Sequence, residues 1–182
     1  MKDTWQIVLG GVGGQGLIFA GLLLGEAAVH DGKNAAQTQS YGIETRGGFS
    51  KSELVVSSGE IVYPAVTTPD LAIILARPAW DRLAPGLPRE CAVVCDSAIG
   101  LTPGGLAERR RPLHALALSE EAAKCGVPQA ANIVALGATV NLIGIIRPES
   151  VEKALERRFS GESLDKNLRA FRAGIALARR TA

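Results

Sequence analysis

Closely spaced glycines near the N-terminus give this sequence its first pattern with a chemical use. Gly11, Gly13 and Gly16 fit the spacing G-x-G-x-x-G, between a short apolar run and a stretch compatible with a helix. Such a turn brings backbone N–H groups and the positive end of a helix dipole close to an anion. Gly11, Gly13, Gly14, Gln15 and Gly16 are therefore candidate ligand contacts. Alternatively, these glycines only pack the turn and the helix against a sheet.

Binding of a nicotinamide dinucleotide is a weaker hypothesis for this turn. It requires an acidic residue about 20 residues further on, which would hold a ribose hydroxyl. The expected second strand, residues 34–38, contains no acid, and Asp31 comes too early. The turn is not a Walker motif either, because no Lys follows its last glycine.

The segment from Gln39 to Gly48 contains glycines and two opposite charges and has no hydrophobic period, which favours a structured loop. Its Arg46 can present a bidentate guanidinium fork to a carboxylate or a phosphate. Alternatively, Arg46 pairs with Glu44 or Glu53 and only stiffens the loop. The further candidate ligand contacts are Ser40, Tyr41, Arg46, Gly47 and Gly48.

The remaining chemically versatile side chains do not form a recognisable centre. Cys91, Cys95 and Cys125 lack the number and spacing for an iron–sulfur cluster, which needs four thiolates, and we expect ordinary buried thiols. Neither His30 nor His114 has a neighbouring nucleophile or carboxylate arrangement. We therefore predict no catalytic residue and no metal ligand in this chain.

The elements that must position these residues alternate between strand and helix. We expect strands at Gln6–Leu9, Asn34–Thr38, Leu71–Leu75, Ala92–Cys95 and Leu113–Leu118, and a hairpin of Phe49–Val56 and Ile61–Val66 turning at Ser58-Gly59. We expect helices from the glycine turn to His30, from an N-cap at Ser119 to Gly126, at Gln129–Ile146, from Pro148, and at Leu164–Arg179. This order predicts an α/β fold, Rossmann-like, with an open, largely parallel sheet, helices on both faces and an added antiparallel hairpin.

The composition is that of one globular domain spanning residues 1–182. Apolar residues make up 47% and charged residues 21%, which argues against disorder. A net charge of +2 is too small to indicate nucleic acid or a membrane surface. The longest apolar stretch, Leu17–Leu24, is far shorter than the ~20 residues of a membrane span, and no signal peptide is visible. We expect a cytoplasmic protein.

A set of short motifs, in order along nearly the whole chain, carries a resemblance to a known family. They are Gly13-Gly14-Gln15-Gly16, Gln37-Thr38-Gln39-Ser40-Tyr41-Gly42, Arg46-Gly47-Gly48, Ser50-Lys51-Ser52-Glu53, Tyr63-Pro64, Pro69-Asp70, Asn132 with Leu136-Gly137, and Asn167 with Phe171 and Gly174. Together they resemble the gamma subunits of 2-oxoacid:ferredoxin oxidoreductases. The motifs at 37–42 and 50–53 are nearest the 2-oxoglutarate type, although Ile43 stands where that type would have proline.

The resemblance implies a subunit that does not turn over alone. The whole enzyme would oxidatively decarboxylate a 2-oxoacid, with 2-oxoglutarate preferred, pass the acyl group to coenzyme A and reduce ferredoxin. Thiamine diphosphate, magnesium and iron–sulfur clusters are expected on partner alpha and beta subunits, with a delta subunit in some assemblies. The gamma subunit would help to bind coenzyme A and complete the assembly, and in isolation it could form a homodimer. The alternative is a free-standing nucleotide- or coenzyme A-binding module without oxidoreductase activity.

Overall fold

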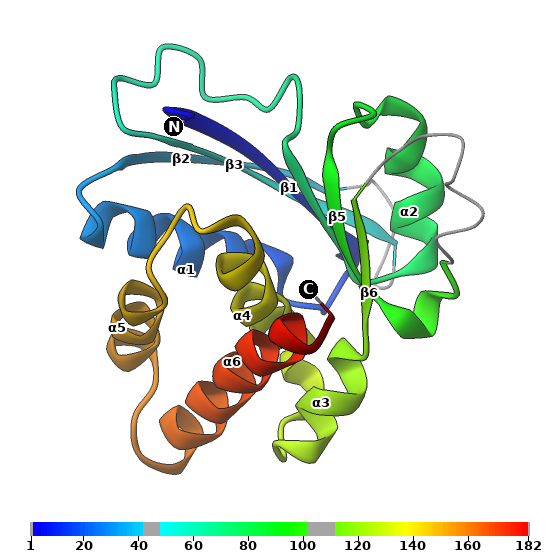
Figure 1. The fold of residues 1–182 in the computed structure, drawn as a ribbon, viewed down its shortest axis with the longest axis vertical. Helices are drawn as coiled ribbons and strands as arrows, with labels where there is room; N and C mark the ends of the chain where they lie inside the picture. The colour runs from blue at the N-terminus through cyan, green and yellow to red at the C-terminus, as the bar shows by residue number, and fades with distance from the viewer. Residues whose placement is uncertain (1, 42–47, 102–111, 182) are drawn as a thin grey trace.

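Within the described residues, the strands and two α-helices between them occupy the first two thirds of the chain, and four α-helices follow (Figure 1). The structure, a computed structural model, describes residues 2–41, 48–101 and 112–181. The strands are β1 (Thr4–Val12), β2 (Asn34–Tyr41), β3 (Phe49–Ser57), β4 (Leu71–Ile74), β5 (Ala92–Asp96) and β6 (Leu113–Leu116). The helices are α1 (Leu17–His30), α2 (Arg77–Leu83), α3 (Leu118–Lys124), α4 (Ala131–Ile143), α5 (Pro148–Arg158) and α6 (Gly161–Thr181).

One sheet of six strands, in the order β2-β3-β1-β4-β5-β6, organises the described part of the chain. β1, β4, β5 and β6 are parallel, and β3 runs antiparallel to both β1 and β2. The predicted α/β class and the antiparallel addition are confirmed. The predicted partner of Phe49–Val56 is wrong, because residues 61–66 form no strand. β2 and β1 fill the two edges of β3, so no edge remains for a third strand.

Several predicted boundaries are also wrong. β1 continues through Gly10 and Gly11 to Val12, and β2 continues to Tyr41, where we expected a loop. β6 ends at Leu116, and α3 already begins at Leu118. Ser119 is therefore not an N-cap. The expected helix 129–146 is a 3₁₀ turn, Pro128–Ala130, followed by α4.

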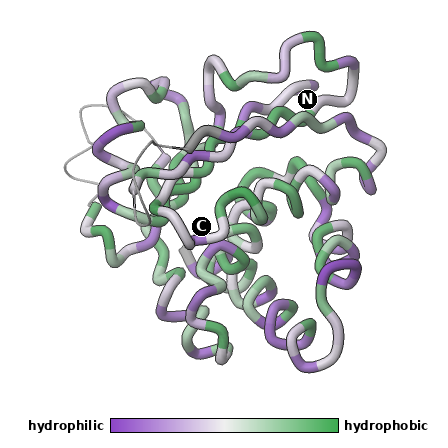
Figure 2. The backbone as a smooth tube through the Cα atoms, turned by 180° about the vertical axis from the view of Figure 1, so that it is seen from behind, coloured by the Kyte–Doolittle hydropathy of each residue, from purple (hydrophilic) through white to green (hydrophobic). Residues whose placement is uncertain are grey.

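Helices cover the two faces of the sheet unequally. Successive strand residues point to opposite faces, so Ile7 and Leu9 join the larger core cluster and Val8 joins the smaller one. The larger cluster lies beneath α1, α4, α5 and α6, and the smaller lies beneath α2. Hydrophilic residues alternate with hydrophobic ones along α5 and α6, as surface helices require (Figure 2).

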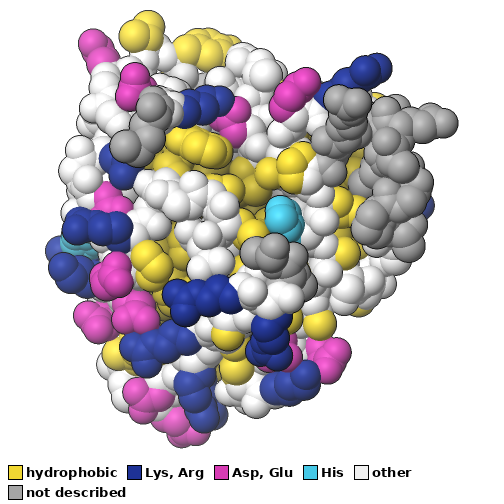
Figure 3. Space-filling view, in the orientation of Figure 1, with side chains coloured by type: hydrophobic (Ala, Val, Ile, Leu, Met, Phe, Trp, Pro, Cys, Tyr) yellow, Lys and Arg dark blue, Asp and Glu magenta, His cyan; other side chains and the backbone are white. Residues whose placement is uncertain are grey.

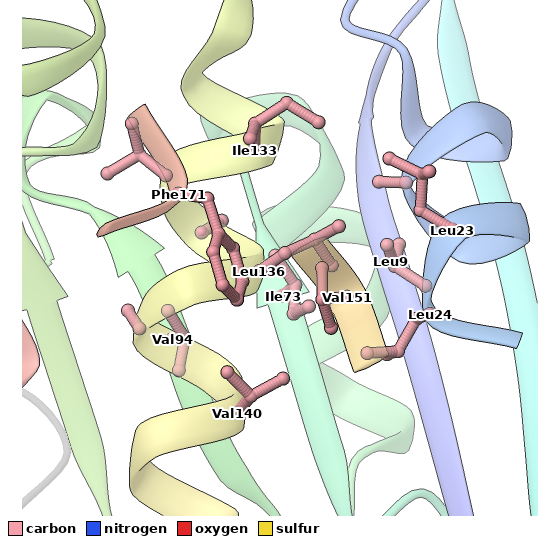
Figure 4. Packing of buried hydrophobic residues seen from close by; sticks show 14 of the residues in the cluster. Leu9, Leu23, Leu24, Ile73, Val94, Ile133, Leu136, Val140, Val151 and Phe171 are labelled. Carbon is pink, nitrogen blue, oxygen red and sulfur yellow. The ribbon is translucent and has the colours of Figure 1, made fainter. Parts of the chain in front are cut away.

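Helix α4 lies at the centre of the larger cluster, with every residue from Asn132 to Val140 buried. Figure 4 shows Leu136 of α4 and Phe171 of α6 packed together in this cluster. The two helices touch through their backbones: a Cβ on Gly137 would lie 1.9 Å from the Phe171 carbonyl oxygen, and one on Gly174 would lie 2.0 Å from the Val134 carbonyl oxygen. Glycine at both positions thus permits this close packing. Among the described residues, no helix combines the length and apolarity that crossing a bilayer requires.

Candidate functional site

The glycine turn connects the carboxyl end of β1 to α1. Because β1 extends to Val12, the turn proper consists of residues 13–16. Gly16, with φ +66°, is the left-handed N-cap of α1, and it offers no side-chain cap to the first-turn N–H groups. Gly14, with φ +95°, has no heavy atom within 4 Å of where a Cβ would lie. The turn therefore leaves open space beside uncapped backbone donors.

The Gln15 side chain holds the turn through two hydrogen bonds, which we call the Gln15 clasp. Its Oε1 accepts a hydrogen bond from the Val12 N–H at 2.8 Å, and its Nε2 donates one to the Leu75 carbonyl at 3.0 Å. Gly11 leaves room for this side chain, because a Cβ there would lie 2.3 Å from Gln15 Oε1 and would displace it. The structure thus gives the Gln15 side chain and Gly11 a positioning role.

This clasp occupies the crevice in which doubly wound folds bind dinucleotides. That crevice lies between neighbouring parallel strands whose helices cover opposite faces. Here the neighbours are β1 and β4, with α1 and α2 on opposite faces, and Gln15 bridges them. In addition, antiparallel β3 stands beside β1, where a dinucleotide fold has its second parallel strand. These features weigh further against a nicotinamide dinucleotide.

A cleft of about 350 Å³ opens on the other side of the turn, towards α4 and α6. We call it the glycine-turn cleft; its lining residues are Gly14, Gly16, Phe19, Val127, Gln129, Ala130, Asn132, Ile133, Phe159, Ser163 and Asn167. None of them is charged. The N-terminal turns of α1, α4 and α6 all contribute, so positive ends of helix dipoles face the cleft.

Two buried asparagines line the cleft, one bonded to the turn and the other bonded within α6. Asn132, 6% exposed, donates from Nδ2 to the Gly16 carbonyl at 3.0 Å, while its Oδ1 accepts from the Ile133 N–H. Asn167, 7% exposed, donates to the Ser163 carbonyl at 2.8 Å. Phe19 and Phe159 meet edge to face, with ring centroids 5.6 Å apart, and supply apolar surface. The cleft thus combines fixed amides with an aromatic wall.

Sequence reasoning identified the turn but did not assign the opposite wall. Asn132 and Asn167 were noticed only as parts of motifs, and Phe19, Phe159 and Ser163 were not singled out. Four of the cleft residues, Gln129, Ala130, Asn132 and Ile133, follow Gly126-Val127-Pro128, yet nothing in the local sequence shows that this segment faces Gly16. The contact between Asn132 and Gly16 spans 116 positions.

The other predicted ligand contacts lie partly outside the described residues. The Gly13 N–H donates to the Gly48 carbonyl at 3.0 Å, which brings Gly48 to the turn. The backbones of Ser40 and Tyr41 form the last two positions of β2 and lie at the same end of the strands as the glycine turn. Arg46 and Gly47 lie outside the described residues, so their predicted contacts stay predictions.

The carboxyl end of β5 is closed by structural hydrogen bonds. Asp96, 3% exposed, accepts from the Ala98 N–H at 3.1 Å, from the Ser119 N–H at 3.0 Å and from the Ser119 hydroxyl. Ser119 thus ties α3 to β5. Burial, together with the Asp96 charge, raises the pKa of the Cys95 thiol to about 12, so this thiol stays protonated at neutral pH.

Comparison with known proteins places the chain in a family. The family model described as Pyruvate ferredoxin/flavodoxin oxidoreductase matches residues 6–177. The chain belongs to this family. The 2-oxoglutarate synthase subunit KorC of Methanocaldococcus jannaschii is 38% identical over 181 residues, which cover 98% of this chain and 96% of that protein. The ketoisovalerate oxidoreductase subunit VorA of Methanothermobacter thermautotrophicus is 35% identical, covering 96% of this chain but 36% of that longer protein.

Solved structures of this family share the fold. The gamma subunit of a keto/oxoacid ferredoxin oxidoreductase from Geobacter sulfurreducens is 36% identical, with a TM-score of 0.86 over 98% of both chains. A 2-oxoglutarate:ferredoxin oxidoreductase from Magnetococcus marinus, solved with 2-oxoglutarate, coenzyme A and succinyl-CoA bound, gives a TM-score of 0.90 at 24% identity. The match covers 99% of this chain and 32% of that one. The resemblance inferred from the motifs is confirmed: this is a gamma-type subunit of a 2-oxoacid:ferredoxin oxidoreductase.

Proposed function

We propose that this chain is the gamma subunit of a 2-oxoglutarate:ferredoxin oxidoreductase and that its glycine-turn cleft holds part of coenzyme A. The preference for 2-oxoglutarate is supported by the KorC relative and by the motifs at 37–42 and 50–53. The cleft itself carries the coenzyme A proposal, because it joins uncapped helix N–H groups to buried amides without a competing carboxylate.

Coenzyme A matches the chemistry of the cleft. Its phosphates suit the backbone N–H groups of the first turn of α1, and the space beside Gly14 permits a close approach. The amides of its pantetheine arm can donate to the Oδ1 of Asn167, to which none of the described residues donates a hydrogen bond. Phe19 and Phe159 offer the apolar contact.

In this proposal the chain binds and orients a substrate, and the bond-breaking steps belong to other subunits. Thiamine diphosphate there would supply decarboxylation of the 2-oxoacid, and iron–sulfur clusters would carry two electrons to ferredoxin. The acyl group leaves as a thioester of coenzyme A, and carbon dioxide is released. This chain's contribution is to place coenzyme A and exclude water around it.

Purification of the tagged chain from its native host tests this assignment. The copurified assembly is assayed for ferredoxin reduction dependent on coenzyme A with 2-oxoglutarate, pyruvate, branched-chain oxoacids and indolepyruvate. The proposal expects thiamine-binding and iron–sulfur subunits and highest activity with 2-oxoglutarate. Greatest activity with another oxoacid would correct the substrate. Recovery of the chain alone, inactive with every oxoacid, would favour the free-standing binding module.

Substitution Ser163→Glu tests the cleft. Ser163 is exposed in the first turn of α6, where an acidic residue suits the helix dipole and should leave folding intact. A carboxylate there repels the phosphates, so we expect the KM for coenzyme A to rise about tenfold, equivalent to ~1.4 kcal/mol, with the KM for the oxoacid unchanged.

The matched control is Ala176→Glu, an exposed position on the same helix outside the cleft. It should leave both KM values unchanged. Equal KM values for coenzyme A in wild type and Ser163→Glu would place coenzyme A elsewhere, without affecting the assignment as a subunit.

A further inference from the structure

The outermost strand β2 has an open side next to exposed apolar residues. β2 is eight residues long and pairs only with β3 in the described sheet. An edge strand presents backbone N–H and C=O groups on which another chain can pair. The opposite edge strand, β6, has four residues. β2 is thus the longer of the two edges.

The exposed large hydrophobic residues of the described chain are Val29, Val62 and Tyr63, with exposures of 61%, 87% and 66%. Val29 lies on α1 just before β2, and Val62 and Tyr63 lie in the segment between β3 and β4. Figure 3 shows hydrophobic side chains at the upper edge of the molecule, where this segment runs in Figure 1. The Asn34 side chain ties the start of β2 to this segment through the Gly59 carbonyl, at 2.8 Å.

Two adjoining clefts follow the first half of β2. One, of about 270 Å³, is lined by Leu22, Gly25, Glu26, Val29, His30, Ala35, Gln37, Leu54 and Arg157. The other, of about 580 Å³, is lined by Val29, Lys33, Asn34, Ala35, Ala36, Gly59, Glu60 and Ile61. Val29 and Ala35 belong to both, so the clefts form one continuous surface, which we call the β2 groove.

Unpaired polar atoms also gather in this groove. Among the described residues, three buried side-chain atoms lack a hydrogen-bond partner, and two of them are Glu26 Oε2 and His30 Nε2. These residues lie one turn apart on α1 and both line the groove. The other carboxylate oxygen of Glu26 already accepts from Arg158. A buried acceptor without a donor costs about 1–3 kcal/mol, so the free chain is incomplete here.

The relatives indicate which polypeptide could supply partners for the unpaired atoms of the β2 groove. In the VorA relative the matched region is 36% of a longer protein, so there the domain and the rest are covalently joined. In the KorC relative of Methanocaldococcus jannaschii the matched region is 96% of the protein, so there non-covalent contacts must replace that connection. Resting on the proposed role as a subunit, we propose that the β2 groove binds an extended segment of a larger subunit of the same oxidoreductase. The segment adds a strand to β2, buries Val29, Val62 and Tyr63, and donates a hydrogen bond to Glu26 or His30.

Hydrogen exchange measured on the isolated chain and on the purified assembly tests this directly. We expect the amides of residues 34–38 to exchange at least tenfold more slowly in the assembly, because added pairing protects an edge strand. The amides of β4, at the centre of the sheet, are the internal reference. Unchanged exchange at residues 34–38 in an intact assembly would overturn the groove proposal alone. Failure to recover any larger subunit would overturn it together with the proposed function.

Substitution Val29→Glu supplies an independent test with a matched control. Val29 and Ala176 are both exposed helix positions, so Val29→Glu and Ala176→Glu should melt like the wild-type chain. We expect Val29→Glu to weaken association with the larger subunits at least tenfold and Ala176→Glu to leave it unchanged. Wild-type association of Val29→Glu would overturn the proposal. So would protection of residues 34–38 in a dimer of the isolated chain that persists in the assembly, because a second copy would then occupy the groove.

Discussion

The glycine-turn cleft and the β2 groove lie at opposite ends of α1 and differ in how their polar groups are satisfied. Beside the cleft, hydrogen bonds within the chain fix the turn, from Asn132 in the cleft wall and from Gln15 on the other side of the turn. In the groove, Glu26 and His30 retain unpaired buried atoms. In our proposals the first region is preorganised for a small ligand, whereas the second is completed by another polypeptide. An isolated gamma-type subunit can thus contain a finished binding cleft and an unfinished interface.

Among the substitutions that test this comparison, Gln15→Ala should have the largest effect on stability. It leaves the Val12 N–H and the Leu75 carbonyl without their partner inside the protein. We expect the free energy of unfolding to fall by about 2–4 kcal/mol, measured by denaturant titration. Exchange at residues 34–38 should not change, because the clasp lies at the far end of α1.

The control for this prediction is Gln129→Ala. Gln129 lines the glycine-turn cleft but is exposed, and its side chain makes no hydrogen bond to the residues that the structure describes. Its loss should change stability by less than about 0.5 kcal/mol. Equal stability losses in the two variants would show that the cleft is not held by the Gln15 clasp.

The sequence predicted the parts of the fold that depend on local pattern. β4 and β5 were recognisable because strands buried on both faces are continuously apolar. The partner of β3 was predicted wrongly because Ser58-Gly59 is a good local turn signal. The actual pairing of β3 with β1 joins Ser57 to Thr4 across 53 positions. Local turn chemistry cannot reveal that both edges of a strand are already occupied.

In the candidate site, too, the sequence predicted the features that depend on local pattern and missed those that depend on long-range contacts. Glycine spacing revealed the turn, because the backbone conformation at Gly14 and Gly16 limits which residues fit. The role of Gln15 depends on Leu75, which is 60 positions away, and the cleft depends on α4 meeting α6. The predicted contacts of Arg46 stay open because that residue lies outside the described ranges.

The C-terminal end of α1 also contains a polar side chain with its hydrogen bonds made, Asp31, and the pH dependence of stability should reveal its contribution. Burial alone would raise the pKa of Asp31, but hydrogen bonds from Ser150 and Arg147 hold this pKa below its usual value. The resulting stabilisation is fully present above the unfolded-state pKa of about 3.9 and is lost as pH falls through the folded-state pKa.

Replacing Asp31 with Asn should therefore lower stability at pH 7 by roughly 2 kcal/mol, the value of a few charge-assisted hydrogen bonds. The difference between wild type and Asp31→Asn should shrink as the pH falls below about 4. Denaturation followed between pH 2.5 and 7 measures it. A difference that stays constant over this range would show that the Asp31 charge does not contribute.

Controls aside, the smallest predicted effect on stability concerns Thr139, whose unpaired buried hydroxyl lies outside the β2 groove. Thr139 Oγ1 is the third unpaired buried atom of the described residues, but it lies in the buried stretch Asn132–Val140 of α4 and lines neither cleft along β2. Thr139→Val keeps the shape and removes the hydroxyl, so we expect stability to rise by about 0.5–1 kcal/mol. Association with larger subunits should not change, which thermal melting and copurification measure. A Thr139→Val chain that loses association would show that association also depends on a buried group outside the β2 groove. The unpaired atoms of Glu26 and His30 would then no longer distinguish the groove, and its case would depend on the open edge of β2 and the exposed apolar residues.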